Sequence, residues 1–227
     1  MKLLCIPIFC FVFIDGIAQL QNIQGAGNEV LKKNKYDDIE GSVYLYDDWR
    51  SGSMVDSKGN VFPNLFLKYD AYKGNLELNK SGVTIVVDKL NHPSFTISYI
   101  DEIDKTIKTE TFKNGISNLP NADIGEYFQV LIEGKIELIK RVKTSILEEN
   151  STTYGGQTKT KRFVKKATYF FRPDANSTFV EIGISKKSII SSIPSYETII
   201  KTDLSKRKIK TEADLVFILN YCSENLK

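Results

Sequence analysis

The sequence predicts an α+β fold: a mainly antiparallel β-sheet with a short helical C-terminal part. Between residues 39 and 184, short segments of alternating apolar and polar residues are separated by turn signals roughly every 8 to 12 residues, a spacing typical of antiparallel sheets. After Gly183 the apolar period lengthens to that of a helix. We therefore expect about ten strands in a curved sheet, an open barrel or a sandwich, with helices gathered at one end or face.

The first strand expected from this pattern is Val61–Asp70, which follows the turn Ser57–Asn60. Alternation divides its apolar residues between two faces: Val61, Leu65, Leu67 and Tyr69 on one, Phe62 and Phe66 on the other. Pro63 has no amide hydrogen and cannot donate to a neighbouring strand. We therefore expect this strand to lie at an edge of the sheet or to begin near Pro63.

Four further strands are expected in the first half of the body, bounded by Gly, Asn or acidic turn residues: Leu76–Leu78, Val83–Val87, Phe95–Ile100 and Ile107–Phe112. The clearest hairpin follows, where Tyr127–Ile132 and Lys135–Lys140 flank a Glu-Gly turn. A second hairpin joins Arg162–Phe171 to Thr178–Ile184. Between the two hairpins, the mostly polar segment Leu147–Thr160 predicts a loop.

The C-terminal part is expected to be helical. Two short helices, Ser185–Ile193 and Ser195–Leu204, are expected on either side of Pro194. A longer helix should begin at Thr211, because Thr211 and Asp214 form a capping-box pattern with Asp in place of the usual Glu or Gln. Its apolar stripe, at helical spacing, consists of Leu215, Ile218, Leu219 and Cys222.

The N-terminus has the features of a secretory signal peptide. Lys2 precedes the apolar run Leu3–Ile14, which is shorter than the ~20 residues that cross a bilayer. Small residues at Gly16 and Ala18 then predict cleavage after Ala18. The expected organisation is a signal peptide at 1–18, a flexible leader at 19–38, a β-rich body at 39–184 and a helical segment packed on the body at 185–227.

The composition of the chain excludes several classes of partner and cofactor. The 227 residues include 31 basic and 28 acidic side chains, a net charge of +3, which is too small to favour nucleic acid as a partner. Neither Cys5 nor Cys10 follows a small residue, so we expect no lipid attachment, and signal cleavage would leave Cys222 without an intramolecular disulfide partner. With His92 as the one histidine, we predict no metal and no cofactor. No transmembrane segment is expected after cleavage.

Catalytic motifs are incomplete throughout the chain. Gly25–Val30 begins like a dinucleotide fingerprint but lacks the third Gly and the preceding strand. Cys222 and His92 have no third group to complete a nucleophilic arrangement, and Ser205–Lys208 matches Ser-x-x-Lys without its companion motifs. The sequence therefore predicts no catalytic residue and favours a protein that is not an enzyme.

Three stretches carry a resemblance to a known group of proteins: Gly41–Trp49 (GSVYLYDDW) continuing to Leu67–Asp70, then Tyr127–Lys140 (YFQVLIEGKIELIK), and a helical tail near Asp214–Tyr221. Together they resemble a family of exported proteins of unknown function from Gram-negative bacteria. The resemblance implies a periplasmic, outer-membrane-associated or secreted protein. It implies no activity, cofactor or site residue.

Three functions are compatible with these features. The favoured one is a non-enzymatic envelope protein that acts by binding or as a component of an assembly, with an envelope lipid, a glycan or another envelope protein as partner. The first alternative is a periplasmic carrier of an apolar ligand, a lipid or a lipoprotein, beneath a helical lid. The second is a glycan hydrolase with paired carboxylates drawn from Asp47, Asp48, Glu126, Glu133 and Glu137.

A ligand-binding site is predicted on the concave face of the sheet near Trp49, Phe66 and Tyr69. Aromatic residues are dense between Tyr44 and Tyr72, and binding sites are generally concave and mostly apolar. Most of these rings should belong to the core, and the others would line the site. Basic residues are concentrated in two later runs, 159–166 and 201–210. We interpret these runs as solvated surface, with contact to anionic lipid headgroups or acidic glycans as the alternative.

Overall fold

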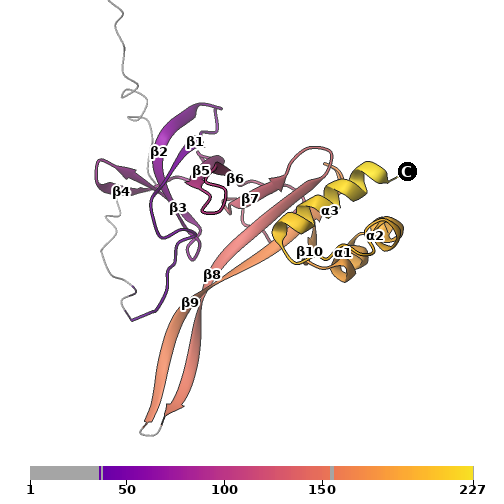
Figure 1. Ribbon diagram of the computed structural model, residues 1–227. Helices are drawn as coiled ribbons and strands as arrows, with labels where there is room; N and C mark the ends of the chain where they lie inside the picture. Colours follow the sequence, from indigo (N-terminus) through magenta and orange to yellow (C-terminus); the bar gives the residue numbers. More distant parts are fainter. Residues whose placement is uncertain (1–35, 37, 154–155, 227) are drawn as a thin grey trace, which may run out of the picture.

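The computed structural model describes residues 36, 38–153 and 156–226, which form ten β-strands followed by short helices (Figure 1). The strands join in one antiparallel sheet that is not closed, in the order β10-β9-β8-β7-β6-β5-β1-β2-β3-β4. The predicted fold class is confirmed. The predicted signal peptide, and the predicted leader apart from residues 36 and 38, lie outside the described residues.

The strands are β1 (Arg50–Val55), β2 (Val61–Asp70), β3 (Asn75–Lys80), β4 (Val83–Val86), β5 (Ser94–Ile100), β6 (Ile107–Lys113), β7 (Phe128–Ile132), β8 (Glu137–Thr153), β9 (Gly156–Arg172) and β10 (Val180–Ile182). The helical part consists of α1 (Lys186–Ser192), the 3-10 turn η2 (Pro194–Tyr196), α2 (Glu197–Thr202) and α3 (Glu212–Asn225). The bounds of β2 are those that the sequence predicts. β1 has no counterpart in the sequence prediction.

The predicted division of β2 into two faces is wrong at the beginning of the strand. Phe62 is buried together with Leu65, while Val61 is 55% exposed. The cause is a β-bulge at Asn64, where φ is 56° and the pairing with β1 shifts by one residue. An extra residue in a strand moves every side chain beyond it to the opposite face, so the alternation predicted from a regular strand fails there.

Of the two positions that Pro63 predicts for this strand, the edge position is wrong, because β2 lies between β1 and β3, but the predicted start near Pro63 is confirmed, because β2 begins at Val61. The part that contains Pro63 nevertheless pairs on one side only, since β3 pairs with β2 from Phe66 to Asp70. Pro63 therefore faces no β3 strand that would require a backbone amide donor. The missing amide hydrogen explains its place beyond the end of the β3 pairing.

β1 is an interior strand although its sequence, RSGSMV, has no apolar alternation. Met54 is its fully buried residue. A Cβ atom at Gly52 would overlap the carbonyl oxygen of Thr96 on the neighbouring β5. Glycine at this position therefore permits the close approach of the β1 and β5 backbones. Because the position requires glycine and not an apolar side chain, apolar alternation in the sequence does not reveal β1 as a strand.

The first half of the sheet curls around an aromatic core. Phe95 and Phe112 stack with ring centroids 4.7 Å apart, and Tyr127 packs edge-on against Phe95 at 4.9 Å. These rings lie among buried aliphatic side chains from β1, β2 and β3. The curl brings the end of β2 to β8, where the amide of Thr144 donates to the carbonyl of Ala71 at 3.0 Å.

One face of the second half of the sheet is covered by the helices, and the opposite face carries a smaller buried cluster formed by Leu119, Phe128, Ile139, Phe170 and Phe179. Leu138 of β8 and Phe171 of β9 are buried against the α3 stripe that the sequence predicts, Leu215, Ile218, Leu219 and Cys222. The predicted capping box at the start of α3 is present. The amide of Asp214 donates to the Thr211 hydroxyl at 3.1 Å, and the Asp214 carboxylate accepts from the Thr211 amide at 3.1 Å.

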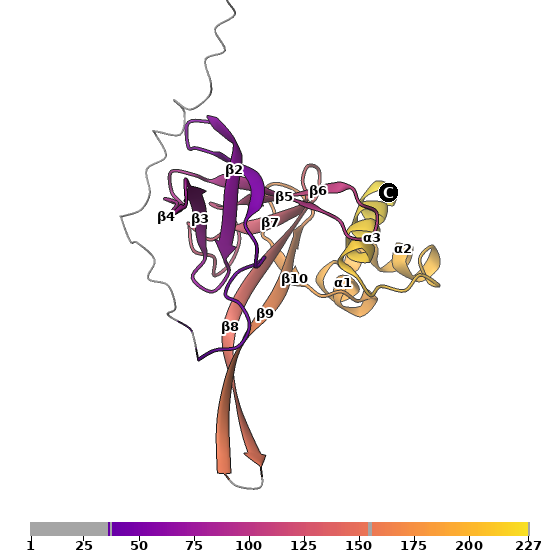
Figure 2. The ribbon, with the colours of Figure 1, turned by 60° about the vertical axis from the view of Figure 1, so that its left-hand side comes forward.

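The predicted loop over residues 147–160 is wrong, because most of this segment is strand. β8 and β9 pair in unbroken register from Glu137↔Arg172 to Thr153↔Gly156. Their outer parts form a two-stranded ribbon that projects away from the other strands and from the helices (Figures 1 and 2). Residues 147–149 and 159–160 are exposed. Because these described residues are exposed, they impose no apolar alternation of the kind that indicates a strand.

Candidate functional site

The three residues of the predicted ligand site do not share one face of the sheet. Tyr69 is 4% exposed and packs within the aromatic core. Phe66, an odd number of residues away on the same strand, is 58% exposed on the opposite face. Trp49 is half-buried, and its ring lies 5.8 Å from the Lys68 ammonium. Because Lys68 and Phe66 are on the same face, Trp49 and Phe66 belong to the outer surface and Tyr69 to the interior.

A hollow lies beside this outer surface, where the chain before β1 crosses from β9 to β2. The amide of Glu40 donates to the Lys161 carbonyl at 2.9 Å, and the amide of Leu45 donates to the Tyr69 carbonyl at 2.8 Å. Gly41 has a φ of 88° and lies against Phe163. This left-handed conformation favours glycine, which lets the segment turn closely over β9.

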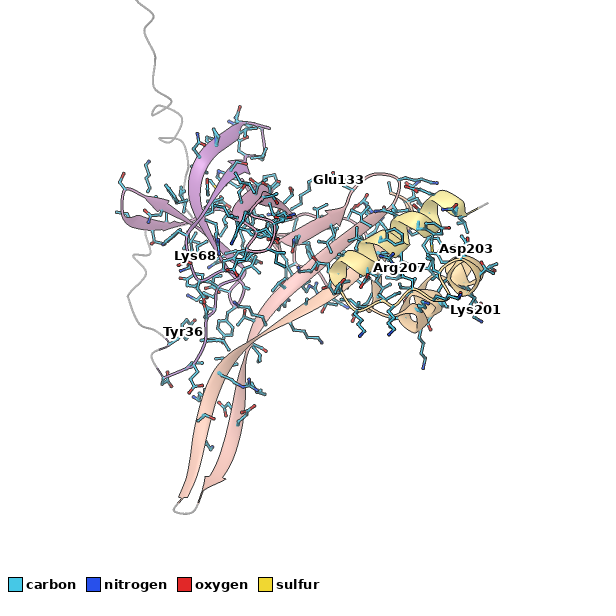
Figure 3. All side chains as sticks on the ribbon, in the orientation of Figure 1. Tyr36, Lys68, Glu133, Lys201, Asp203 and Arg207 are labelled. Atoms are coloured by element: carbon cyan, nitrogen blue, oxygen red, sulfur yellow. The ribbon has the colours of Figure 1, made fainter. Side chains whose placement is uncertain are left out.

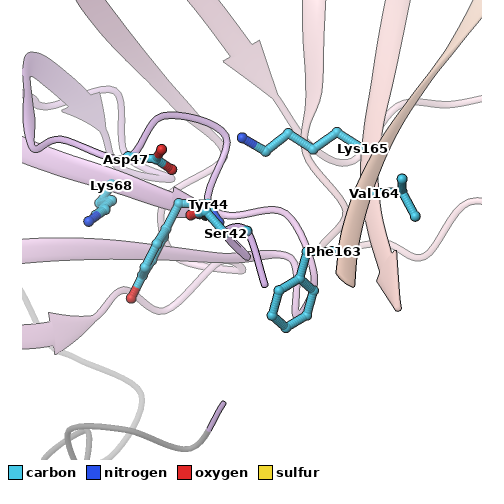
Figure 4. A pocket seen from close by; sticks show the side chains of 8 residues that line it. Ser42, Tyr44, Asp47, Lys68, Phe163, Val164 and Lys165 are labelled. Carbon is cyan, nitrogen blue, oxygen red and sulfur yellow. Dashed lines mark hydrogen bonds between the residues drawn. The ribbon is translucent and has the colours of Figure 1, made fainter. Parts of the chain in front are cut away.

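The resulting pocket is open to solvent and has a volume of about 750 Å³ (Figure 4). Its lining comes from the crossing segment, β2 and β9: Gly41, Ser42, Tyr44, Asp47, Lys68, Phe163, Val164 and Lys165. Two ammonium groups, one carboxylate and two aromatic rings therefore surround one hollow. Such a set can bind an anionic group through the lysines and an apolar group through the rings.

Lys68 is held by aromatic rings. Its ammonium lies 4.1 Å from the centre of the Tyr44 ring and 5.8 Å from that of Trp49. The Tyr44 hydroxyl donates to Glu77 at 3.2 Å, and burial together with the Glu77 carboxylate raises the pKa of Tyr44. Tyr44 therefore stays neutral, and its ring is fixed in position beneath the ammonium.

Lys165 approaches from the other side of the pocket. Its ammonium donates to the carbonyl of Leu45 at 3.2 Å, so the hydrogen bond leaves its positive charge uncompensated. Among the described residues, neither Lys68 nor Lys165 forms an ion pair with a carboxylate. Asp47 is the acidic member of the lining. The pocket therefore carries a net positive charge.

A separate polar cluster lies on the concave face between the two cores. The Tyr46 hydroxyl donates to Glu110 at 2.8 Å. On the adjoining strands, the Lys140 ammonium lies 2.8 Å from Glu212, and the Tyr169 hydroxyl donates to Glu212 at 3.1 Å. Because Glu212 begins α3, Lys140 and Tyr169 fasten the helix to the sheet. The contacts are internal, and we assign the cluster a structural role.

The carboxylates considered for hydrolysis do not converge. Glu126 lies 3.0 Å from both Arg141 and Lys143. Glu133 pairs with Lys113 at 2.6 Å, and Glu137 pairs with Arg172 at 2.8 Å. Asp47 and Asp48 are exposed in the crossing segment. Each of the three glutamates thus has its own basic partner, and none faces a second carboxylate from that set across the pocket.

Cys222 and His92 occupy different parts of the interior. Cys222 belongs to the core beneath the helices, and burial raises the pKa of its thiol to about 11. His92 lies near Phe62, 6.2 Å between ring centroids, in the first half of the sheet. A thiol with a raised pKa is a poor nucleophile at neutral pH. Across the described residues, no three His, Cys, Asp or Glu side chains are grouped as metal ligands.

The predicted site lies on the concave face, whereas Trp49 and Phe66 belong to the outer surface, and the prediction misses Lys68 and Lys165. Alternation places Lys68 on the same face as Phe66, and that signal is present in the sequence. Lys165 lines the pocket because the crossing segment lies over β9, and no local sequence pattern indicates that contact. None of the helices in the described residues combines the length and apolarity needed to cross a bilayer. No family model, curated protein or solved structure matches this chain.

Proposed function

We propose that this chain is an exported, non-enzymatic binding protein of the cell envelope, and that its pocket binds an anionic ligand. The observation that carries the proposal is the pair of lysines, Lys68 and Lys165, which face one open pocket and, within the described residues, form no ion pair at salt-bridge distance. Aromatic rings from Tyr44 and Phe163 complete the lining. Export rests on the N-terminal signal pattern of the sequence.

The arrangement suits a ligand with a phosphate or carboxylate group next to an apolar or sugar-ring surface. A cation held against an aromatic ring is already partly ordered, so binding costs little further side-chain entropy. Asp47 at the pocket would repel a second anionic group placed beside it, which gives the site a means of discrimination. Glycerol phosphates and acidic sugars of the envelope have this combination of charge and bulk.

The two alternative functions have less support. A carrier of apolar ligands needs a cavity within the curled sheet, and the stacked rings of Phe95 and Phe112 occupy that interior. A carboxylate hydrolase needs two carboxyl groups facing one another across a cleft. Glu126, Glu133 and Glu137 each pair with a basic side chain instead.

Trp49 fluorescence tests the binding proposal, because the ring lies beside Lys68 and is the chain's one tryptophan. Glycerol phosphate, muropeptides and acidic oligosaccharides are titrated separately, and each mixture is then assayed for turnover. At least one ligand should change the fluorescence, and Lys68→Met should weaken its binding by roughly tenfold or more, the value of a charge-assisted contact. Lys58→Met, in the β1–β2 turn, is the matched control and should bind normally.

Three results would contradict the binding part of the proposal, and a fourth would contradict export. Hydrolysis of any candidate would identify an enzyme. Equal binding by Lys68→Met and the native chain would remove the pocket as the site, and no fluorescence response to any candidate would leave an assembly role instead. For export, intact-mass measurement on protein from the native envelope should give a chain that begins at Gln19; a chain that retains residues 1–18 would refute it.

A further inference from the structure

The outer part of the β8–β9 ribbon, residues 143–153 and 156–166 and here called the arm, is a distinct feature of the surface. β7 last pairs with β8 at Lys140, and β10 last pairs with β9 at Tyr169. Beyond these points β8 and β9 pair with each other, with contacts from the crossing segment near the base of the arm. Tyr36 packs against Phe163 there at 5.4 Å (Figure 3). The remainder of the arm extends away from the body in both views (Figures 1 and 2).

Charge is concentrated on this arm. Residues 143–166 include six basic and two acidic side chains, a net charge of +4, whereas the whole chain has a net charge of +3. The other residues therefore sum to a slightly negative charge. The asymmetry lies in the arrangement of charge along the chain, and the small total charge conceals it.

The two acidic residues do not neutralise the arm. Glu148 lies 3.8 Å from Lys161, and Glu149 lies 2.7 Å from Arg162, in exposed pairs that contribute little energy. Within the described residues, Lys159 and Lys166 form no ion pair. Lys166 also pairs directly across the strands with Lys143. Glu126 of the body pairs with Lys143 at 3.0 Å, so Lys166 is the member of this cross-strand pair that keeps an unpaired positive charge in the described part of the chain.

Apolar side chains lie between these cations. In the β8–β9 register, Leu147 is opposite Arg162, and Val164 is opposite Ser145 on the same face as Lys166. Leu147 is 38% exposed. Long basic side chains that surround exposed aliphatic groups can place their ammonium groups among phosphates while the aliphatic groups enter the headgroup region. A soluble polyanion would use the cations and leave the aliphatic groups without a partner.

We propose that the arm docks on the surface of an anionic phospholipid bilayer. The projecting position lets the arm reach the surface while the body stays in water. Both faces of the arm carry cations, because the residues of β9 alternate in direction. The base of the arm contributes Phe163, Val164 and Lys165 to the lining of the ligand pocket, whereas the four basic residues changed in the test below lie outside that lining. The inference therefore stands whether or not the pocket binds an anion.

Vesicle sedimentation tests this proposal with the full chain. The probes are vesicles of phosphatidylcholine, and vesicles of equal parts phosphatidylcholine and phosphatidylglycerol. The arm variant K159Q/K161Q/R162Q/K166Q leaves Lys165 in place. At ~1 kcal/mol for each basic side chain near an anionic surface, it should bind the anionic vesicles roughly a thousandfold more weakly. All variants keep the same N-terminal residues, so the difference in partitioning reports the arm.

The helical part provides a matched control. K187Q/K206Q/K208Q/K210Q removes the same charge from exposed lysines outside the arm and should bind like the native chain. Equal losses in the two variants would show that net charge, not the arm, drives binding. Native binding by the arm variant, or equal binding of the native chain to both vesicle types, would also overturn the proposal.

Two further measurements establish whether the partner is a bilayer and whether the arm and the pocket act independently. Sedimentation with heparin immobilised on agarose beads should show weaker binding than with anionic vesicles. Tight binding to these beads, with none to anionic vesicles, would identify a soluble polyanion as the partner. The arm variant should keep the native melting temperature and the native Trp49 response to pocket ligands, while Lys68→Met should keep vesicle binding. If the arm variant or Lys68→Met lost both vesicle binding and the Trp49 response, the arm and the pocket would not be independent sites.

Discussion

Two halves of one sheet bury their apolar residues by different means. In the first half, the core consists of side chains from strands and connecting loops, with Phe95 and Phe112 stacked at its centre. In the second half, Leu138 and Phe171 are buried beneath a separate layer of helices. A sheet that curls covers its own apolar face, whereas a part that does not curl needs a second layer. In this sheet, the helices therefore cover the part whose apolar face the curl does not enclose.

The polar cluster marks the border between these two halves. Glu110 and Tyr46 adjoin the aromatic core, and Lys140, Glu212 and Tyr169 adjoin the helical layer. Since the two cores meet across polar contacts, each should lose stability independently when its own residues are changed. Substitutions in the helical layer, the aromatic core, the helix cap and the border test this comparison in order of decreasing effect.

The largest effect is expected for Ile218→Asp in α3. Ile218 is fully buried in the core beneath the helices, and an unpaired carboxylate there carries a high desolvation cost in addition to lost packing. We expect a loss of about 4 kcal/mol or more in the free energy of unfolding, measured in urea. Ala213→Asp, exposed in the first turn of α3, introduces the same group and should be neutral. Equal stability of the two variants would mean that α3 is not part of the fold.

Phe95→Ala should rank second, with a loss of about 3 kcal/mol. Phe95 is fully buried and contacts both Phe112 and Tyr127. Phe66→Ala removes the same ring from an exposed position of β2 and should change stability by less than about 0.5 kcal/mol. Combining Phe95→Ala with a mild change in the helical layer, Ile218→Val, should give additive losses. A coupling energy above about 1 kcal/mol would contradict two separate cores.

The same comparison explains what could be predicted from sequence. The α3 stripe and the β2 bounds were predictable because a buried face imposes a period on the chain, 3.6 residues in one and two in the other. The face of Phe62 was not, because a bulge at Asn64 leaves no apolar signature. The arm was not predictable either, because its described outer residues, 147–149 and 159–160, are exposed and impose no apolar alternation on the sequence.

The candidate sites follow the same rule. Trp49 and Phe66 could be placed near a surface from local pattern, because aromatic density and alternation are local properties. Alternation already separates Tyr69 from Phe66, but which of the two faces is the interior depends on the way the sheet curls. Lys165 joins Lys68 through a crossing that links residue 40 with residue 162. Such a contact depends on tertiary structure, and one sequence holds no signal for it.

Thr211→Ala should have a smaller effect, a loss of about 1 kcal/mol, the usual value of a helix N-cap. The Thr211 hydroxyl accepts from the Asp214 amide, so the change leaves one amide at the start of α3 without a side-chain acceptor. Thr211→Ser keeps the hydroxyl and should retain most of the stability. Thermal unfolding of the three chains measures the difference. A fully stable Thr211→Ala would show that packing of the stripe alone fixes the start of α3.

The smallest effect is expected at the border, from Glu110→Gln. Burial raises the pKa of Glu110 above its ordinary value of 4.5, although the Tyr46 hydroxyl and the Lys140 ammonium both act to lower it. A carboxyl group with a raised pKa binds its proton more tightly in the folded chain. Its contribution to stability is therefore fully present below pH 4.5 and is lost as the pH rises through the folded-state pKa.

Glutamine keeps an oxygen that can accept from Tyr46 and does not ionise. Glu110→Gln should therefore resemble the native chain in acid and become slightly more stable than it at pH 7, with a gain below that expected for the helix cap. The pKa of Asp214 is lowered by backbone hydrogen bonds, so its contribution to stability changes with pH in the opposite direction. The measured quantity is therefore the difference in the free energy of unfolding between Glu110→Gln and the native chain at each pH. If the native chain were the more stable at pH 7, the ionised Glu110 would be contributing through Lys140, and the border would be an ionic link between the two halves.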